Sequence, residues 1–386
     1  MAAGQIVAET LLAMADALEG RVKAESFKIG LTLLPNEVGV SELLDGAVAA
    51  ARSNPLLEPV LIGPEMTELD KTDAGIITHI KTGSAANSIH QAMEQLLQNR
   101  EIDAAVTMHY NFPLGTATVG RVTTPGRGRE IFLATTTGTS ATDRVQALVK
   151  NALAGLTCAR ACGIARPRLG ILNIEGARAC ERVLKSLKAN GYSFEFARSV
   201  RADGGALMRG NDLLAGNCDV LLCDSLTGNI LMKVLSAFTT GGKYEAQGCG
   251  YGPGLGATFE RLVLIISRAS GAPVVAGALR YAAELLAGKV LAVYRRELEQ
   301  AQKAGLTELL TAAKGEKEVA VSPPAAKAVS AEIGGVDILE LETAVRCLWQ
   351  AGIYAASGMG CTGPVILVAS GDKEQARNIL KQEGYL

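Results

Sequence analysis

The chain has few of the residues that mark several common classes of protein. Only 4% of its 386 residues are aromatic whereas 43 are glycine, a composition typical of helices and strands joined by tight loops rather than of a β-sandwich. Its three histidines, His79, His90 and His109, lie far in sequence from Cys158 and Cys162, two cysteines one helical turn apart. We therefore expect no metal site.

Charge of one sign and long apolar runs are also lacking. The formal net charge is −1, which gives no electrostatic reason to expect nucleic acid or an anionic membrane as a partner. No run of about 18 apolar residues is present, so no membrane span is expected. Glu9, Asp16 and Glu19 interrupt the first twenty residues, which therefore do not read as a signal peptide. Eight cysteines without regular spacing read as reduced thiols, and we expect a cytoplasmic protein.

Strand and helix patterns alternate through most of the chain. A first helix is expected within 1–27, and an α/β domain over 28–287. In that domain the patterns predict strands over 28–34, 58–63, 75–80, 104–108, 130–135, 168–174 and 219–224, and helices over 40–53, 86–99, 143–162, 177–190 and from 229. This alternation predicts a doubly wound, mainly parallel sheet with helices on both faces.

A C-terminal extension, with helical and α/β parts, is expected over 288–386. Pro323 and Pro324 mark the stretch 314–327 as a linker or exposed loop. Beyond it the patterns predict a helix around 338–350, a glycine-rich turn over 358–364, a strand over 365–369 and a last helix over 373–382.

Polar and glycine-rich segments follow four of the predicted strands, those ending near 108, 135, 174 and 223. Open α/β sheets bind ligands at the carboxyl ends of their strands, and helix N-termini there suit an anion such as phosphate. The candidate phosphate or acyl ligands are Asn111, Thr116, Thr137, Thr139, Ser140, Asp224, Asn229 and Lys233.

Structural explanations compete for several of these candidates. Residues 135–140 could simply cap the helix that begins near Asp143, and Asn111 and Asn229 could be turn residues. Lys233 could pair with Asp224 or reach a bound anion. The run 248–256, with its many glycines, reads as a flexible loop or as a loop that closes over an acyl group.

Cys361 differs from the other cysteines because Gly358, Gly360 and Gly363 surround it. Glycines in a turn allow backbone N–H groups to approach a reacting carbonyl, so Cys361 is a candidate nucleophile. A buried filler residue is the alternative interpretation.

Two runs of sequence resemble a known enzyme family. They are Arg168-Leu-Gly-Ile-Leu-Asn-Ile-Glu-Gly and Asp219-Val-Leu-Leu-Cys-Asp-Ser-Leu-Thr-Gly-Asn-Ile-Leu-Met-Lys. Both are similar to the acyl-acyl-carrier-protein:phosphate acyltransferases of bacterial phospholipid synthesis, and the similarity extends over about 28–283. It implies a fold like that of phosphate acetyltransferases and isocitrate-dehydrogenase-like proteins. Tyr110 and Phe112 stand where that family has small residues, which implies a short acyl group.

With its extra C-terminal residues, the whole chain resembles the smaller subunit of protein C of the glycine/sarcosine/betaine reductase complex. The run Gly358-Met-Gly-Cys-Thr-Gly-Pro carries this resemblance. It implies formation of acetyl phosphate from an acetyl thioester and inorganic phosphate, with no cofactor, and Cys361 matches the cysteine that would carry the acetyl group. The implied partners are a larger protein C subunit, similar to ketoacyl-acyl-carrier-protein synthases, and the selenocysteine-containing protein A.

Three hypotheses follow from these observations. In the first, acetylated Cys361 is attacked by phosphate held at the strand-end loops. In the second, the chain is a phosphate acyltransferase that uses coenzyme A or acyl-carrier-protein thioesters, and Cys361 is incidental. In the third, the chain is a non-catalytic scaffold for the larger, thiolase-like subunit.

Overall fold

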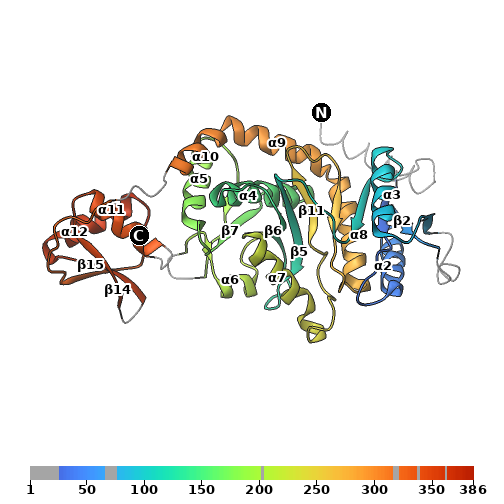
Figure 1. Cartoon of the computed structure of the whole chain (residues 1–386), viewed down its shortest axis with the longest axis horizontal. Helices are drawn as coiled ribbons and strands as arrows, with labels where there is room; N and C mark the ends of the chain where they lie inside the picture. The colour runs from blue at the N-terminus through green and yellow to red at the C-terminus, as the bar shows by residue number, and fades with distance from the viewer. Residues whose placement is uncertain (1–25, 66–75, 201–203, 316–320, 337–339, 361–362) are drawn as a thin grey trace, which may run out of the picture.

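The computed structural model describes residues 26–65, 76–200, 204–315, 321–336, 340–360 and 363–386. A large α/β domain and a small C-terminal domain make up this part of the chain (Figure 1). The helix expected within 1–27 lies almost wholly outside the described residues.

One large sheet forms the centre of the α/β domain. In the described residues it has 12 strands, in the order β3-β2-β1-β4-β12-β11-β5-β6-β10-β7-β8, with β9 also paired to β7. Its strands are β1 (Phe27–Thr32), β2 (Leu57–Gly63), β3 (Thr78–Lys81), β4 (Ala104–Thr107), β5 (Thr116–Thr123), β6 (Glu130–Thr139), β7 (Arg168–Leu172), β8 (Glu195–Phe196), β9 (Leu207–Met208), β10 (Val220–Leu222), β11 (Gly252–Gly256) and β12 (Val263–Ile265). Most pairings are parallel, which confirms the predicted fold class.

The sheet contains two parallel sets of strands that run in opposite directions. Strands β1 to β4 and β12 form the first set, and β6 to β10 form the second. The strands β11 and β5 stand between the sets, and the three pairings β12–β11, β11–β5 and β5–β6 are all antiparallel. The four polar loops follow β4, β6, β7 and β10. They do not share one edge of the sheet, because β4 runs opposite to the other three strands.

The two strands that reverse the sheet were not expected from the sequence. The segment 252–256, read as part of a glycine-rich loop, forms β11 in the middle of the sheet. Its glycines are needed there, because a Cβ on Gly252 would lie 1.7 Å from the carbonyl oxygen of Val119 on β5. The flexible-loop interpretation of this segment is therefore wrong.

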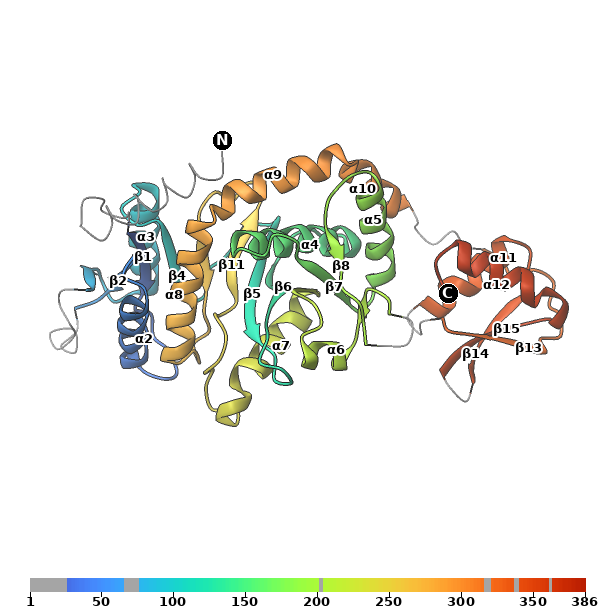
Figure 2. The same ribbon diagram turned by 180° about the vertical axis from the view of Figure 1, so that it is seen from behind.

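Helices cover both faces of the sheet. They are α2 (Val40–Ser53), α3 (Ala86–Gln98), α4 (Arg144–Ala161), α5 (Ala177–Ala189), α6 (Gly210–Ala215), α7 (Ser225–Ala237), the 3-10 helix η2 (Phe238–Thr240) and α8 (Ala272–Ala287). In Figures 1 and 2, α7 and α4 lie on opposite faces of β6. Helix α7 begins at Ser225 rather than at Asn229, because the Asp224 side chain accepts a hydrogen bond from the backbone N–H of Thr227 and caps the helix.

Two further helices, α9 (Val290–Lys303) and α10 (Leu306–Gly315), fall in the segment assigned to the C-terminal extension. They share the apolar core of the large domain, into which Val290, Tyr294 and Leu306 are buried. The buried Glu297 carboxylate of α9 accepts a hydrogen bond from Tyr192 (2.5 Å) and pairs with Arg160 of α4.

The small C-terminal domain has a core of its own. It contains β13 (Ala331–Gly334), α11 (Leu341–Gln350), β14 (Ala355–Gly360), β15 (Gly363–Val368), the 3-10 helix η4 (Ser370–Asp372) and α12 (Lys373–Gln382). Its three strands pair antiparallel in the order β13-β15-β14 under α11 and α12. It lies at one end of the molecule next to α5 (Figure 1), where Arg178 is 3.8 Å from Glu340 and Arg182 lies over the Tyr385 ring.

Candidate anion-binding site

A cavity of about 630 Å³ lies where α7 faces the segments that follow β1, β4 and β12. This volume suits a small-molecule site. The described residues that line it are Glu37, His109, Tyr110, Thr137, Asn229, Lys233, Gly242, Lys243, Tyr251 and residues 265–269. Residues from both parallel sets of strands thus meet at this cavity.

The ammonium group of Lys233 is held in a fixed position at the cavity wall. Its Nζ lies 2.5 Å from Oε1 of Glu245 and donates to Oγ of Ser267 at 2.9 Å. Glu245 is only 1% exposed, and its carboxylate also accepts hydrogen bonds from Tyr251 (2.9 Å) and Ser270 (2.7 Å). Because the buried carboxylate has all these partners, it anchors Lys233, whose side chain is still 47% exposed and open to a ligand.

Two more cationic side chains line the same cavity. Lys243 is exposed, and Arg268 lies 3.1 Å from Glu37. The side chain of Asn229 lies one helical turn before Lys233 on α7. Lysine, arginine and amide N–H groups are the donors that recognise phosphate oxygens, so this part of the cavity is suited to an anion.

Three of the candidate ligands expected from the sequence, Thr137, Asn229 and Lys233, line the cavity. Lys233 pairs with Glu245 rather than with Asp224. Asp224 accepts from both the backbone N–H (3.0 Å) and the hydroxyl (2.7 Å) of Thr227.

The other expected candidates lie outside the cavity lining. Ser140 is buried and lies 2.6 Å from Oδ1 of Asn151, while Thr116 is buried and pairs with Thr139 between β5 and β6. Asn111 is exposed, next to the lining residue Tyr110. The candidate nucleophile Cys361 lies outside the described residues, and the strands on either side of it pair through Gly360 and Gly363.

The threonine-rich segment 135–139 is the end of strand β6 and not a loop. Oγ1 of Thr118 lies 2.8 Å from Oγ1 of Thr136 and accepts from the backbone N–H of Thr137 at 2.7 Å. The Thr136 hydroxyl donates to the carbonyl of Tyr251 at 2.6 Å and so ties β6 to the chain just before β11. The helix after this segment is capped instead by Asp143, which accepts from Gln146.

Several lining residues were not among the sequence candidates. Lys243 follows the 3-10 helix η2 and Arg268 follows strand β12, and neither element was expected from the sequence. Glu245, the buried partner of Lys233, lies between them in sequence. The available signal was the isolated run Lys243-Tyr-Glu, the charged part of a glycine-rich stretch.

Aromatic rings stand beside the cavity at Tyr110. The rings of Tyr110 and Phe112 lie 4.9 Å apart, and those of Phe112 and Phe259 lie 5.3 Å apart. A Cβ on Gly254 would lie 2.3 Å from the Phe112 ring, so this ring packs directly on the backbone of β11. The Tyr110 hydroxyl donates to Glu94 at 2.5 Å, and burial raises its pKa.

The cysteines in the described ranges are poor candidates for a thiolate. Burial raises the pKa of Cys158, Cys218 and Cys249 to about 12, and it also raises the pKa of Cys162, Cys180, Cys223 and Cys347. A thiol with such a raised pKa carries almost no thiolate at neutral pH.

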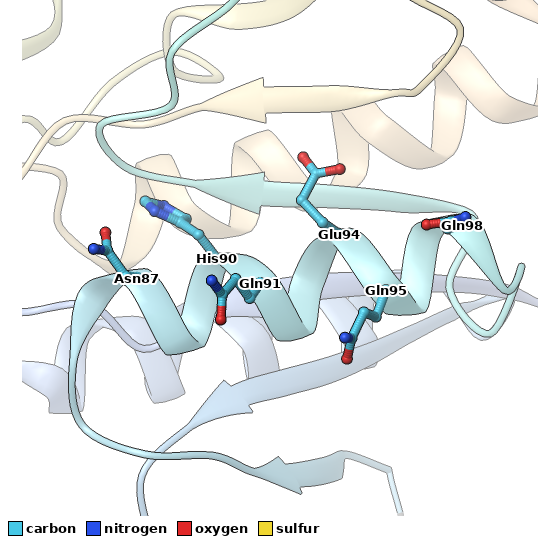
Figure 3. A pocket seen from close by; sticks show the side chains of 6 residues that line it. All are labelled: Asn87, His90, Gln91, Glu94, Gln95 and Gln98. Atoms are coloured by element: carbon cyan, nitrogen blue, oxygen red, sulfur yellow. The ribbon is translucent and has the colours of Figure 1, made fainter.

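A second cavity, also of about 630 Å³, has a different chemical character. Figure 3 shows its described lining side chains projecting from α3, namely Asn87, His90, Gln91, Glu94, Gln95 and Gln98. Two of them have partners in the fold, since Nε2 of His90 is 3.1 Å from the carbonyl oxygen of Met108 and Glu94 accepts from Tyr110. This described lining contains no lysine or arginine, so the cavity beside α7 is the better anion site.

Within the described residues, no three His, Cys, Asp or Glu side chains gather closely enough to hold a metal ion. None of the helices in the described ranges has the length and apolar character needed to cross a membrane.

Comparison with solved structures gives a weak similarity. A 4-hydroxythreonine-4-phosphate dehydrogenase from Klebsiella pneumoniae aligns with 67% of this chain and 99% of its own, at 13% identity and a TM-score of 0.39. The fold of this chain follows from the order and direction of its strands.

Comparison with known sequences gives a clear family. Residues 27–367 match the model of the fatty acid synthesis protein family. The chain is 49% identical, over 99% of its length and 98% of the relative's, to the glycine/sarcosine/betaine reductase complex component C subunit alpha of Peptoclostridium acidaminophilum. It is 30% identical to a phosphate acyltransferase of Thermus thermophilus, over 54% of this chain and 70% of the relative. The chain therefore belongs to the fatty acid synthesis protein family, which it shares with the alpha subunits of this reductase component and with phosphate acyltransferases.

Proposed function

We propose that the chain is an acyltransferase subunit of a glycine/sarcosine/betaine reductase complex, and that it makes acetyl phosphate from an acetyl thioester and inorganic phosphate. The 49% identity to the component C alpha subunit over 99% of the chain is the main support. The cavity lined by Lys233, Lys243 and Arg268 supports the phosphate part of the proposal.

In this mechanism phosphate binds to the cationic side of the cavity. Lys233 and Lys243 neutralise its charge, and Asn229 donates to one of its oxygens. Another phosphate oxygen attacks the thioester carbonyl carbon, the C–S bond breaks, and sulfur leaves as a thiolate while acetyl phosphate forms. The cations and N–H donors stabilise the negative charge of the tetrahedral intermediate, typically by about 3 kcal/mol per donor.

The acetyl group is proposed to arrive as a thioester of Cys361. The thiolate that leaves is then the Cys361 sulfur, which is ready for the next acetyl group. Tyr110 lines the cavity and its ring lies 4.9 Å from that of Phe112, and these bulky rings support a short acyl group rather than a long one. The larger component C subunit and the selenocysteine-containing protein A are the proposed partners that load the cysteine.

Labelling tests this function directly. The full chain, purified with its partner subunit, is incubated with acetyl phosphate carrying a radioactive acetyl group, and the protein-bound label is measured. The unsubstituted chain and Cys347→Ala, a control cysteine in the same domain, are expected to take up acid-stable, hydroxylamine-sensitive label, and Cys361→Ala is expected to take up none. Full labelling of Cys361→Ala would refute the role of this cysteine.

One observation favours a second candidate function. The described lining of the cavity comes entirely from the large domain, and the chain is 30% identical over 54% of its length to a phosphate acyltransferase. The chain could therefore transfer the acyl group directly from coenzyme A or an acyl-carrier protein. Acetyl phosphate formation from acetyl-coenzyme A by Cys361→Ala, at the rate of the unsubstituted chain, would favour this reading.

A further inference from the structure

His109 is a lining residue of the cationic cavity that the mechanism above leaves without a role. It lies just after strand β4 and lines the same cavity as Asn229 and Lys233. Its side chain is exposed, and no hydrogen bond or ion pair within the described part of the chain engages its ring. The ring nitrogens are therefore available to a molecule bound in the cavity.

The other two histidines of the chain are held by the fold. Nε2 of His79 lies 3.2 Å from the carbonyl oxygen of Gly63, at the β3 edge of the sheet. Nε2 of His90 lies 3.1 Å from the carbonyl oxygen of Met108, and its side chain lines the second cavity. The rings of these two histidines thus have structural partners, whereas the ring of His109 faces the candidate anion site.

The backbone holds His109 in a conformation that is uncommon for a residue with a side chain. Its φ is 53°, in the left-handed region. The residues on either side are fixed, since the side chain of Met108 is fully buried and the Tyr110 hydroxyl donates to Glu94. Such conformations persist where the surrounding structure imposes them, and they are frequent at functional sites. The fold therefore sets the position from which the imidazole projects.

The other titratable side chains of the described lining are less suited to proton transfer. The carboxylate of Glu37 lies 3.1 Å from the guanidinium of Arg268. Burial raises the pKa of Tyr110 and of Tyr251, so both hydroxyls stay protonated at neutral pH. The lysines of the lining supply the positive charge that holds phosphate in the mechanism above. Histidine is the side chain that most often transfers protons near neutral pH.

We propose that His109 is the proton donor to the leaving sulfur in the acyl transfer to phosphate, and this inference rests on that proposed function. Hydrogen phosphate attacks the thioester carbonyl carbon, and the electron pair of the C–S bond passes to sulfur. A ring N–H of the His109 imidazolium gives its proton to that sulfur, so that a thiol is released. The proton of the newly formed acetyl phosphate then moves to the imidazole and restores the imidazolium.

A proton donor is needed because of the charges that the step creates. Without it, a thiolate would form next to the anionic acetyl phosphate in the same cavity, and the two negative charges would repel one another. Protonation of the sulfur removes one of them and prevents the thiolate from attacking the product. The argument is the same whether the sulfur belongs to Cys361 or to coenzyme A.

Single-turnover release of the acetyl group tests the proposal. The full chain with its partner subunit is loaded with radioactive acetyl label as described above, free label is removed, and release of acetyl phosphate is followed at several phosphate concentrations. His109→Gln is expected to lower the maximal rate by about 100-fold or more, a usual contribution of general acid catalysis, with little change in the phosphate concentration that gives half of that rate. His79→Gln is the matched control and is expected to keep the rate of the unsubstituted chain. Circular dichroism checks that both variants are folded.

The pH dependence of loading separates proton transfer from a structural role. In loading, which is the reverse reaction, His109 takes the proton of the thiol, and no base is needed once the thiol is ionised. A free cysteine ionises near pH 8.5, so the rate defect of His109→Gln is expected to shrink between about pH 7 and about pH 9.5. The other titratable groups of the lining are the same in both proteins, namely Glu37, Tyr110, Lys233, Lys243, Tyr251 and Arg268.

Three results would overturn the role of His109 alone, given an active unsubstituted chain. They are an unchanged maximal rate in His109→Gln, a defect confined to the phosphate concentration needed, and a loading defect of the same size at every pH. An unsubstituted chain that releases no acetyl phosphate would refute the proposed function together with this inference.

Discussion

At the scale of single residues, Lys233 and Glu245 form the best-defined charged pair of the cavity. The carboxylate of Glu245 is 1% exposed and has three partners, whereas water still reaches the Lys233 side chain. Such a pair contributes little net stability as a whole, yet loss of one partner leaves a charge without compensation. The structure therefore predicts that the two residues are energetically coupled.

A double-mutant cycle measures this coupling. Lys233→Ala is expected to lower the free energy of unfolding by about 2 to 3 kcal/mol, because it leaves the buried carboxylate without a counter-ion. Adding Glu245→Gln should recover at least about 1 kcal/mol of that loss, since the charge is then removed as well. Urea denaturation gives the values.

The surface pair Arg295–Glu260 is the control for this cycle. Both of its side chains are more than half exposed, so Arg295→Ala should change the free energy of unfolding by less than about 1 kcal/mol. Strictly additive effects of Lys233→Ala and Glu245→Gln would contradict the coupling.

The sequence predicted part of the cavity. Lys233, Asn229 and Thr137 were candidates because they follow strands in a β–α pattern, which is a local signal. Glu245 and Arg268 could not be predicted in the same way. They come close to Lys233 only because β11 and β12 bring 245–269 against α7, and this long-range pairing leaves no periodic pattern in the sequence.

At the scale of elements, α7 is the element that positions the site. It approaches β6 so closely that a Cβ on Gly228 would lie 1.9 Å from the carbonyl oxygen of Thr135 and 3.0 Å from Sγ of Cys223. A glycine at this position therefore allows the helix to lie against the strand, and the distance between them sets where Asn229 and Lys233 project.

Gly228→Ala is expected to destabilise the protein. The clash with β6 should cost about 1 to 3 kcal/mol or more, which outweighs the gain of up to about 1 kcal/mol that alanine brings to a helix. Gly210→Ala in α6 is the control, because no heavy atom lies within 4 Å of its added Cβ, and it should be neutral or slightly stabilising. Urea denaturation of both variants is the measurement. Equal stability of the two variants would show that α7 can move away from β6 at no cost.

Elements with regular patterns were predicted well, and the irregular ones were not. The ranges of α2 and α12 agree with the expected helices, since both have a clear apolar face. Strand β5 was missed because it is buried on both faces and rich in small residues and threonine, so its sequence TATVGRVT lacks the alternation of a half-exposed strand. The reversal of the sheet was missed with it.

At the scale of the whole molecule, the two parts of the proposed site belong to different domains. The large domain contains the cationic cavity, and the small domain contains the β14–β15 hairpin whose sequence includes Cys361. The proposed acyl transfer requires the acetyl group of the small domain to reach the cavity of the large one, within one chain or between two copies.

The central claim is that the cavity beside α7 binds inorganic phosphate. Isothermal titration of phosphate into the full chain tests it most directly, with Lys233→Ala compared with Lys185→Ala, a lysine variant on the outer side of α5. The account predicts binding to the unsubstituted chain and to Lys185→Ala, and at least tenfold weaker binding to Lys233→Ala, since a charge-assisted hydrogen bond contributes about 1.5 to 3 kcal/mol. Equal phosphate affinity of the two variants, or no binding to the unsubstituted chain, would contradict it.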